Sequence, residues 1–257
     1  LITSISFLIG AFSSAIAGYA GIWVSVRANL RVAAAARNDY NAALQICFRG
    51  GAFAAIINVA LAIFGISFLY LMLSFHFYVN APVPGSLPPI EEIPVLLVGF
   101  GFGASFVAMF AQLGGGIYTK AADVGSDLVG KVEKGIPEDD PRNAGVIADL
   151  VGDNVGDCAG RGADLFESTA AENIGAMILG VGVYAVATQA GWPNPQAWIF
   201  FPLVVRAFGL LSTIVAMFFV RGREDEDPMN MLNRGYWVTT ILSVISLAFV
   251  TSTMMQT

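Results

Sequence analysis

Charged side chains recur at helical spacing in one short part of the chain. The first row has intervals of three, four and four residues and consists of Lys120, Asp123, Asp127 and Lys131. The second row has intervals of four residues and consists of Asp149, Asp153, Asp157 and Arg161. Residues three or four apart on an α-helix share a face, so each row would line one ridge. Like charges at this spacing repel one another, and the repulsion weakens a helix unless cations lie between them.

Magnesium is the cation that fits two such rows best. It is a hard ion that takes oxygen ligands, keeps several of its waters and shares its coordination shell with substrate phosphates. Calcium also takes carboxylate oxygens, but the spacing of an EF-hand loop does not occur in this sequence. The chain has one histidine, His76, and no set of Cys and His residues spaced for zinc.

These residue types favour metal-assisted transfer of a phosphoryl group to water. Mg²⁺ would neutralise a phosphate-rich substrate, Lys120 would add a positive charge, and a carboxylate would orient or deprotonate the attacking water. Residues 134–142 read KGIPEDDPR, and the two prolines indicate a rigid turn that carries Glu138, Asp139 and Asp140. At least one of these acids could reach the metals, whereas a solvated position is favoured for Asp139 and Asp140.

Glycines run beside the acids in register. Three of them stand one residue before the last three members of the second row: Gly152, Gly156 and Gly160. Small residues let helix backbones approach closely in a membrane, so one helix would carry a packing seam beside its acidic ridge. Three successive glycines at 114–116 precede Lys120 and could mark a helix break.

The elements that position these residues are expected to be membrane helices. Hydrophobic residues make up 56% of the chain and charged residues 12%, with a mean hydropathy of +0.69, whereas a soluble domain has about 25% charged residues. A bilayer core needs about 20 apolar residues per helix. Six segments qualify: residues 5–26, 52–75, 95–113, 165–187, 198–219 and 237–254.

We therefore expect an all-α transmembrane bundle. Residues 1–257 would form a single transmembrane domain, and we interpret the chain as a piece of a longer membrane protein. Residues 114–164 would form a catalytic loop together with its flanking helix ends. The net charge of −6 argues against binding to nucleic acid, because a phosphate backbone needs a basic surface.

The basic residues predict the orientation. Twelve of the thirteen Lys and Arg residues lie in the first, third and fifth connections or at the adjoining helix ends. Six antiparallel spans would place these connections on one side, which the positive-inside rule makes cytoplasmic. The catalytic loop would then be cytoplasmic in an integral, multi-pass protein, which in a bacterium lies in the inner membrane. The thirteenth residue, Arg206, lies within the fifth span, where we expect it to pair with an acid, structurally or in transport.

Acidic residues also continue into the fourth span. On a regular helix Asp164 lies two turns beyond Asp157 on the same face, and Glu167 follows one turn later. Acids inside a membrane are functional by default, often as ion relays. A continuous acidic face would link the phosphate site to an ion path. The alternative for Glu167 is a structural pair with Arg161 or Arg206.

The stretch GGGIYTKAADVGSDLVGKVEKGIPEDDPRNAGVIADLVGDNVGDCAG (residues 114–160) resembles the signature of the membrane-bound, ion-translocating inorganic pyrophosphatases. The segments AGYAGIWVSVRANLRVAAAAR and FRGGAFAAIINVAL also look similar to this family. The resemblance implies a fold of roughly sixteen spans, of which this chain would hold about the third to the eighth.

The resemblance implies hydrolysis of pyrophosphate with Mg²⁺, which drives H⁺ or Na⁺ out of the cytoplasm. The residues implied to bind pyrophosphate are Lys120, Glu138 and Asp149. Those implied to hold the metal are Asp123, Asp127, Glu138, Asp153 and Asp157. The implied catalytic residues are Asp157 and Lys120. Asp157 would be one of two acids that place the nucleophilic water. The implied ion gate consists of Asp164, Glu167 and Gln112.

This chain departs from the family pattern near the gate. Many members have Arg where Gln112 stands, and many have Ala where Ser126 stands. Ala171 stands where plant-type proton pumps carry their gate glutamate, and Glu167 is placed as in sodium pumps and some proton pumps. The ion stays open, with H⁺ preferred on family abundance, and so does K⁺ as an activator.

The resemblance also implies a homodimer and a second acidic cluster nearer the C-terminus of the whole protein. This chain would then hold half an active site and would not hydrolyse pyrophosphate alone. Two other classes of protein are alternatives. A non-enzymatic divalent-cation channel or transporter would explain the acids but not Lys120 and Lys131. A structural membrane subunit would leave the acidic face unexplained.

Overall fold

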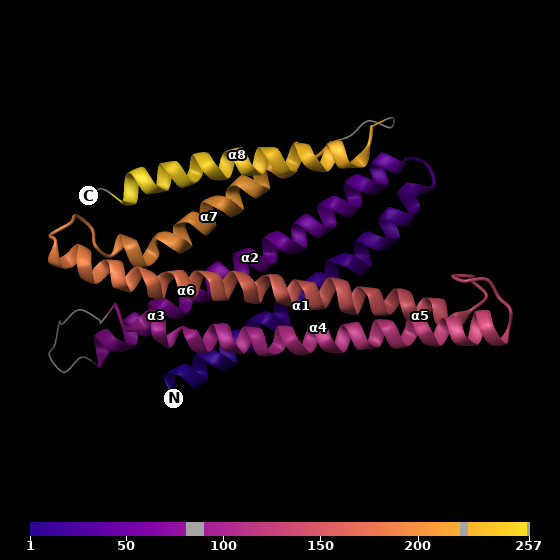
Figure 1. Cartoon of the computed structure of the whole chain (residues 1–257), viewed down its shortest axis with the longest axis horizontal. Helices are drawn as coiled ribbons and strands as arrows, with labels where there is room; N and C mark the ends of the chain where they lie inside the picture. The colour runs from indigo at the N-terminus through magenta and orange to yellow at the C-terminus, as the bar shows by residue number, and fades with distance from the viewer. Residues whose placement is uncertain (81–89, 222–225, 256–257) are drawn as a thin grey trace.

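The computed structural model of the protein describes residues 1–80, 90–221 and 226–255, and the regular elements of these residues are all helices (Figure 1). Segments η1 and η2 are π-helical and the others are α-helical. In chain order they are α1 (Ile2–Ala36), α2 (Tyr40–Val79), α3 (Ile93–Leu96), α4 (Val98–Asp127), η1 (Leu128–Glu133), α5 (Ala144–Asp153), η2 (Asn154–Gly160), α6 (Arg161–Gln189), α7 (Ala197–Met217) and α8 (Pro228–Met254).

Within the described residues, six helical stretches are long and apolar enough to cross a membrane. Five contain an expected span completely, and Ala197–Met217 ends two residues before the expected end at 219. The all-α transmembrane prediction is therefore confirmed. The helices also extend well past their apolar segments. The stretch Ala144–Gln189 has 46 residues, about 69 Å of helix against a hydrocarbon core of about 30 Å. The polar parts that precede residue 165 and follow residue 113 thus project beyond the membrane.

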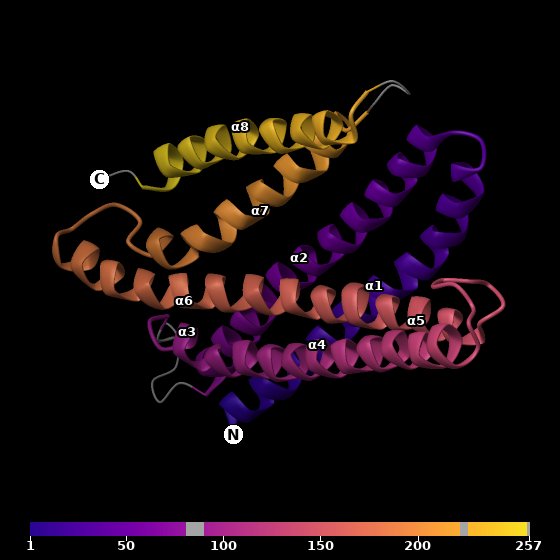
Figure 2. The ribbon, with the colours of Figure 1, turned by 45° about the vertical axis from the view of Figure 1, so that its right-hand side comes forward.

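The projecting part is mostly helix. Of the expected catalytic loop, 114–164, only residues 134–143 connect separate helices. The glycines at 114–116 do not break α4, so that expectation was wrong: α4 runs without interruption from Val98 to Asp127. The rod formed by α4 and η1 lies beside the rod formed by α5, η2 and α6, and α1 and α2 run obliquely across both (Figures 1 and 2).

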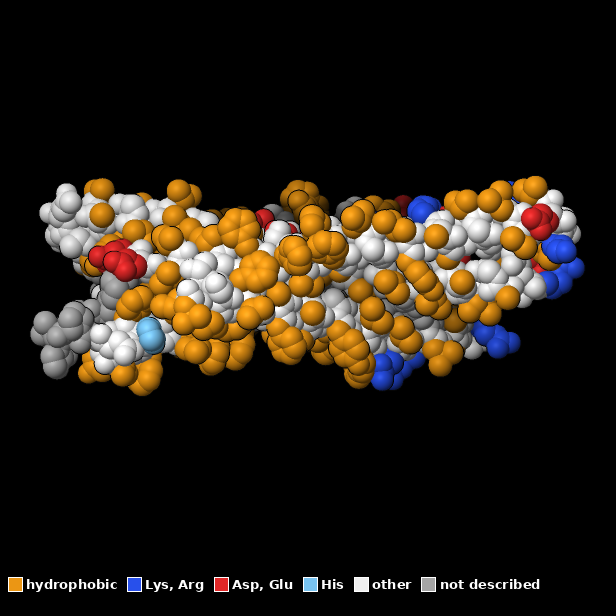
Figure 3. Space-filling model, turned by 90° about the horizontal axis from the view of Figure 1, so that it is seen from below, with side chains coloured by type: hydrophobic (Ala, Val, Ile, Leu, Met, Phe, Trp, Pro, Cys, Tyr) orange, Lys and Arg blue, Asp and Glu red, His pale blue; other side chains and the backbone are white. Residues whose placement is uncertain are grey.

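The helix ends that adjoin the three connections rich in Lys and Arg lie at one end of the molecule, on the right in Figure 1. Most of the Lys and Arg side chains that Figure 3 shows, in blue, lie towards this same end, and the pale blue histidine lies towards the opposite end. Three of the helices that start at this end are capped by an Asp or Asn side chain, which accepts hydrogen bonds from backbone N–H groups of the first turn: Asp39, Asn143 and Asp227.

The core lies where α1, α2, α4 and α6 meet. Phe100 of α4 and Phe166 of α6 are fully buried, with ring centroids 5.9 Å apart. The backbones of α1 and α4 touch because glycine leaves room. A Cβ atom on Gly103 would lie 1.9 Å from the carbonyl oxygen of Phe7.

The predicted glycine seam is confirmed. It packs the rod of α5 and η2 against α4. A Cβ atom on Gly115 would lie 2.8 Å from the Cα atom of Gly156, and one on Gly152 would lie 2.9 Å from the Cα atom of Thr119. A Cβ atom on Gly160 would lie 3.1 Å from the Cα atom of Gln112. Backbone contact of this kind fixes how the two charged rows face each other.

The π-helical segments change the register of the second row. A π-turn is closed by hydrogen bonds between residues five apart and so holds about one residue more than an α-turn. Asp149 and Asp153 precede η2, Asp157 lies within it, and Asp164 follows it. The expectation that these acids share one continuous ridge is therefore wrong beyond Asp153.

We predict that Gly115→Ala lowers stability, whereas Gly116→Ala does not. At Gly115 the new methyl group meets the backbone of Gly156, and overpacking of this kind costs roughly 1–3 kcal/mol. Gly116 has open space around its Cβ position, so the change gains up to about 1 kcal/mol of helix propensity. Thermal unfolding of the two variants in detergent checks the difference, and equal melting temperatures would contradict the seam.

We also predict the sidedness of the membrane. A reporter inserted after Pro193, between α6 and α7, is expected outside the cytoplasm, and one inserted after Asn38, between α1 and α2, inside it. Alkaline phosphatase activity and green fluorescence report the two locations. A cytoplasmic signal at Pro193 would refute the orientation. The matching position at Pro84 lies outside the described residues.

Candidate active site

Three aspartates lie near enough to Asp149, where α4 meets α5, for their charges to act on it. We call Asp123, Asp139, Asp149 and Asp153 the carboxylate cluster. Lys120 lies on the same helix face as Asp123, and its Nζ atom donates a hydrogen bond to Oδ2 of Asp123 at 3.0 Å. This bond raises the pKa of Lys120, and the charges of Asp149 and Asp153 add to the effect from across the seam.

The pKa of Asp149 shows that the cluster is crowded. It is raised above the ordinary carboxyl value, first by partial loss of hydration and then by the negative charges of Asp123, Asp153 and Asp139, while Lys120 opposes the rise. Members of both predicted rows therefore act on one another through space. A cation or a cation-bearing ligand placed here would relieve that repulsion.

A second charged group lies at the end of the same rod. The Nζ atom of Lys131 donates to Oε2 of Glu138 at 2.8 Å, which raises the pKa of Lys131, with a further contribution from the charge of Asp127. In the same turn Arg142 binds Asp140 through its backbone N–H and its guanidinium group. These bonds lower the pKa of Asp140 to about 2. The negative charge of Asp140 is therefore compensated by Arg142, which agrees with a position outside the metal site.

Asp157 faces different neighbours from the cluster. Nε of Arg161 donates to its Oδ1 atom at 3.2 Å, and both side chains are mostly exposed. The two residues line a groove between α1, α2 and η2, together with Gly21 and Asn58. The structure thus brings Lys120, Asp123, Asp149 and Asp153 together, while Asp157 and the pair of Lys131 and Glu138 lie on either side of them.

The donor set fits magnesium that is shared with a substrate. In the part of the chain that the structure describes, no three His, Cys, Asp or Glu side chains lie close enough to enclose a metal ion by themselves. The cluster offers only carboxylate oxygens, and their mutual repulsion favours a divalent cation. Magnesium typically takes one or two carboxylates and completes its shell with waters and phosphate oxygens.

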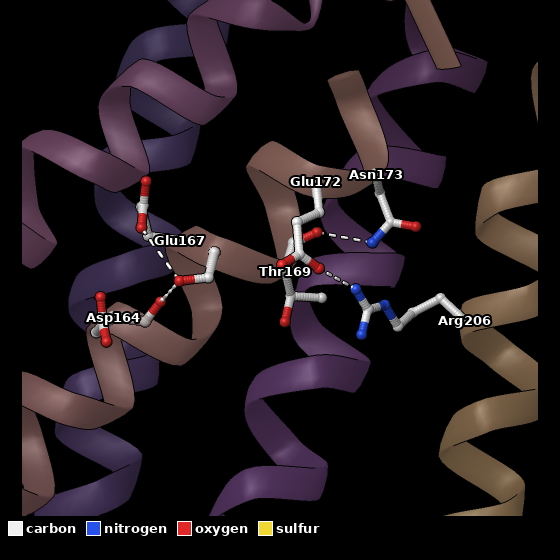
Figure 4. A network of polar contacts seen from close by, with 7 residues as sticks. Asp164, Glu167, Thr169, Glu172, Asn173 and Arg206 are labelled. Carbon is white, nitrogen blue, oxygen red and sulfur yellow. Dashed lines mark hydrogen bonds and ion pairs between the residues drawn. The ribbon is translucent and has the colours of Figure 1, made fainter. Parts of the chain in front are cut away.

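The residues implied to form the ion gate lie at the start of α6. Asp164 and Glu167 are half-buried, one turn apart (Figure 4). The Ser168 hydroxyl donates to the backbone oxygen of Asp164 at 2.8 Å and lies 3.4 Å from Oε2 of Glu167. Gln112 lies beside Gly160, just before them. Among the described residues, neither acid has a Lys or Arg partner, so the structural-pair alternative for Glu167 is not borne out.

Arg206 of α7 pairs instead with Glu172 of α6, through its Nη2 atom and the Oε2 atom of the acid (Figure 4). The expectation that Arg206 pairs with an acid is confirmed. The pair joins α6 to α7 and compensates both charges inside the membrane. It leaves Glu167, one to two turns away along α6, available for another role.

Polar side chains that were not predicted from the sequence hold η2 and the start of α6. Oγ of Ser25 and Nδ2 of Asn29 both donate to Oδ1 of Asn154, at 2.7 and 3.0 Å. Nδ2 of Asn58 donates to the carbonyl oxygen of Gly162 at 3.2 Å. A signal for them exists, because Ser25 and Asn58 lie within apolar spans, where polar side chains commonly bond to a neighbouring helix.

The chain is similar to known proteins over its whole length. A family model described as "Inorganic H+ pyrophosphatase" matches residues 1–257. The chain is 58% identical to a K(+)-insensitive pyrophosphate-energized proton pump of Caldanaerobacter subterraneus subsp. tengcongensis, over 98% of this chain and 34% of that protein. It is 55% identical to pyrophosphate-energized membrane proton pump 3 of Arabidopsis thaliana, over 95% of this chain and 31% of that protein.

A relative named for another ion is also similar. The chain is 44% identical to a putative K(+)-stimulated pyrophosphate-energized sodium pump of Clostridium tetani, over 98% of this chain and 33% of that protein. The chain thus spans about a third of the length of the curated relatives that it matches.

We predict opposite effects of two Asp→Asn changes on stability when divalent cations are absent. Because the pKa of Asp149 is raised in the folded state, its charge destabilises the fold above that pKa, and Asp149→Asn raises the melting temperature at neutral pH. The gain disappears as pH falls below 3.8, the ordinary carboxyl value.

Asp140→Asn is the matched control for this prediction. The pKa of Asp140 is lowered to about 2 in the folded state, so its charge stabilises the fold above the ordinary value and the stabilisation is lost as pH falls towards 2. This variant therefore melts lower at neutral pH. Melting curves in detergent with a chelator test both, and a lower melting temperature for Asp149→Asn would refute the crowding.

Proposed function

Because the chain belongs to the family of inorganic H⁺ pyrophosphatases, we propose that the protein carrying it hydrolyses magnesium pyrophosphate to two phosphates and moves H⁺ across the membrane. One observation in this chain supports the proposal most strongly. The carboxylate cluster, with Lys120, lies at the projecting end of the same continuous rod that carries Asp164 and Glu167 towards the membrane.

We assign the residues by their surroundings. Lys120 places a cation beside the carboxylate cluster and would contact a phosphate oxygen. Lys131 would do the same from η1, where Glu138 holds it and would reach the substrate only through Mg²⁺. Asp123, Asp127, Asp149 and Asp153 supply carboxylate oxygens for Mg²⁺, which withdraws charge from the phosphates when bound. Asp157 is the acid left to orient or deprotonate the attacking water, because its carboxylate is exposed and bound only by Arg161 among the described residues.

Movement of the ion would begin beside this site. Asp164 and Glu167 lie half-buried, without a Lys or Arg partner in the described part of the chain, so a proton or Na⁺ could exchange on their carboxylates. We prefer H⁺, because the relatives at 58% and 55% identity are named proton pumps, while the relative named a sodium pump is at 44%. For the same reason we propose that K⁺ is not required. A homodimer is part of the proposal and comes from family resemblance alone.

The test uses the full-length protein in sealed vesicles supplied with magnesium pyrophosphate. Phosphate release and acidification of the lumen are measured together, with and without Na⁺. We expect acidification that does not need Na⁺. Asp157→Ala is expected to lower both rates by at least about 100-fold, because a lost acid or base typically costs that much.

Asp140→Ala serves as the matched control, since Asp140 lies at the same end of the molecule and is already bound by Arg142. It should keep most of the hydrolysis rate. Hydrolysis that survives Asp157→Ala would overturn the role of Asp157, and accumulation of Na⁺ in place of acidification would change the ion. The 257-residue chain alone is expected to release no phosphate.

A further inference from the structure

Segment η2 joins two groups of acids along one continuous rod. Asp149 and Asp153 precede it, and Asp164 and Glu167 follow it. Every residue inserted in a turn rotates all that follows it around the helix axis. The π-helical form of η2 therefore sets the direction in which the acids of the ion path face, relative to the acids of the carboxylate cluster.

The first end of η2 is held from α1. Asn154, its first residue, accepts hydrogen bonds from Ser25 and Asn29 and donates to the carbonyl oxygen of Leu150 at 2.9 Å. The backbones also touch there, because a Cβ atom on Gly21 would lie 2.5 Å from the carbonyl oxygen of Cys158. A π-turn is rare in proteins and is formed where surrounding contacts favour it, and these contacts come from another helix.

The second end of η2 is held from α2. Asn58 is 2% exposed, and its Nδ2 atom donates to the carbonyl oxygen of Gly162, two residues after the end of η2. The two residues are 104 positions apart in the chain, so the bond fixes the junction of η2 and α6 against a separate span. The fit is close as well, since a Cβ atom on Gly162 would lie 3.3 Å from that same Nδ2 atom.

We infer that Asn58 is a positioning residue that holds the junction of η2 and α6 in its π-helical register and so keeps hydrolysis coupled to ion movement. This inference rests on the proposed function. Without the bond, the junction relaxes towards the α-helical register, which rotates Asp164 and Glu167 away from their present direction. The carboxylate cluster stays in place, because the contact of Gly152, which precedes η2, with Thr119 holds it independently.

Asn58→Leu in the full-length protein tests this inference. Leucine keeps the branched shape of asparagine but cannot donate a hydrogen bond. Phosphate release and initial ion transport are measured in the same vesicles, and their ratio gives the ions moved per pyrophosphate. We expect this ratio to fall at least about threefold, while KM for magnesium pyrophosphate stays within about twofold. Asn58→Ser, which restores a shorter donor, should recover part of the ratio.

Asn173→Leu is the matched control. Asn173 is also buried in the membrane part, at 3% exposure, but its Nδ2 atom donates to Thr169 of its own helix, at 2.7 Å. It should keep the ratio of the unaltered protein. An unchanged ratio in Asn58→Leu, or an equal loss in Asn173→Leu, would overturn the inference.

Two outcomes need separate treatment: a variant that does not assemble, and an unaltered protein that does not hydrolyse pyrophosphate. If Asn58→Leu does not assemble, Asn58→Ala takes its place, because it removes the same hydrogen-bond donor without adding an apolar side chain of equal size. An unchanged ratio in Asn58→Ala then overturns the inference. If the unaltered protein releases no phosphate, the proposed function itself fails and this inference with it, whereas normal hydrolysis with an unaffected ratio refutes this inference alone.

Discussion

Repulsion among carboxylates at one end of the molecule is the interaction around which the other features are arranged. The pKa of Asp149 is consistent with it, because that pKa is raised first by partial loss of hydration and then by the charges of Asp123 and Asp153. The helices that carry these acids cannot separate to relieve it, since the backbones of Gly115 and Gly156 are in contact. A cation bound among these carboxylates would relieve their repulsion. The glycine seam brings the two rods together and so brings their acidic residues near one another.

Much of this arrangement could be predicted from local pattern. Apolar length identified the six spans, and the four-residue spacing of Gly152, Gly156 and Gly160 identified a packing seam because an α-helix repeats at nearly that interval. The same reasoning failed at η2. A regular helix was expected there, whereas η2 is π-helical and its two ends bond to Ser25, Asn29 and Asn58 from distant parts of the chain. Contacts of that kind depend on how spans pack, which spacing within one span does not encode.

The partner of Arg206 was predictable as a type but not as a residue. A guanidinium group within a span requires an acid, and Glu167 and Glu172 both lie on the helix that precedes it. The rotation of α7 against α6 selects Glu172. That choice leaves the carboxylate of Glu167 without a basic partner among the described residues.

The length of the rod formed by α5, η2 and α6 has an electrical consequence. The carboxylate cluster projects beyond the apolar part of the bundle, whereas Glu167 lies within it. A transmembrane voltage falls across the low-dielectric layer and does work of about 2.3 kcal/mol per unit charge per 100 mV on a charge that crosses it. Under the proposed function, a polyanion bound at the projecting end would therefore lie outside this field, and only an ion carried past Glu167 would do work against the voltage.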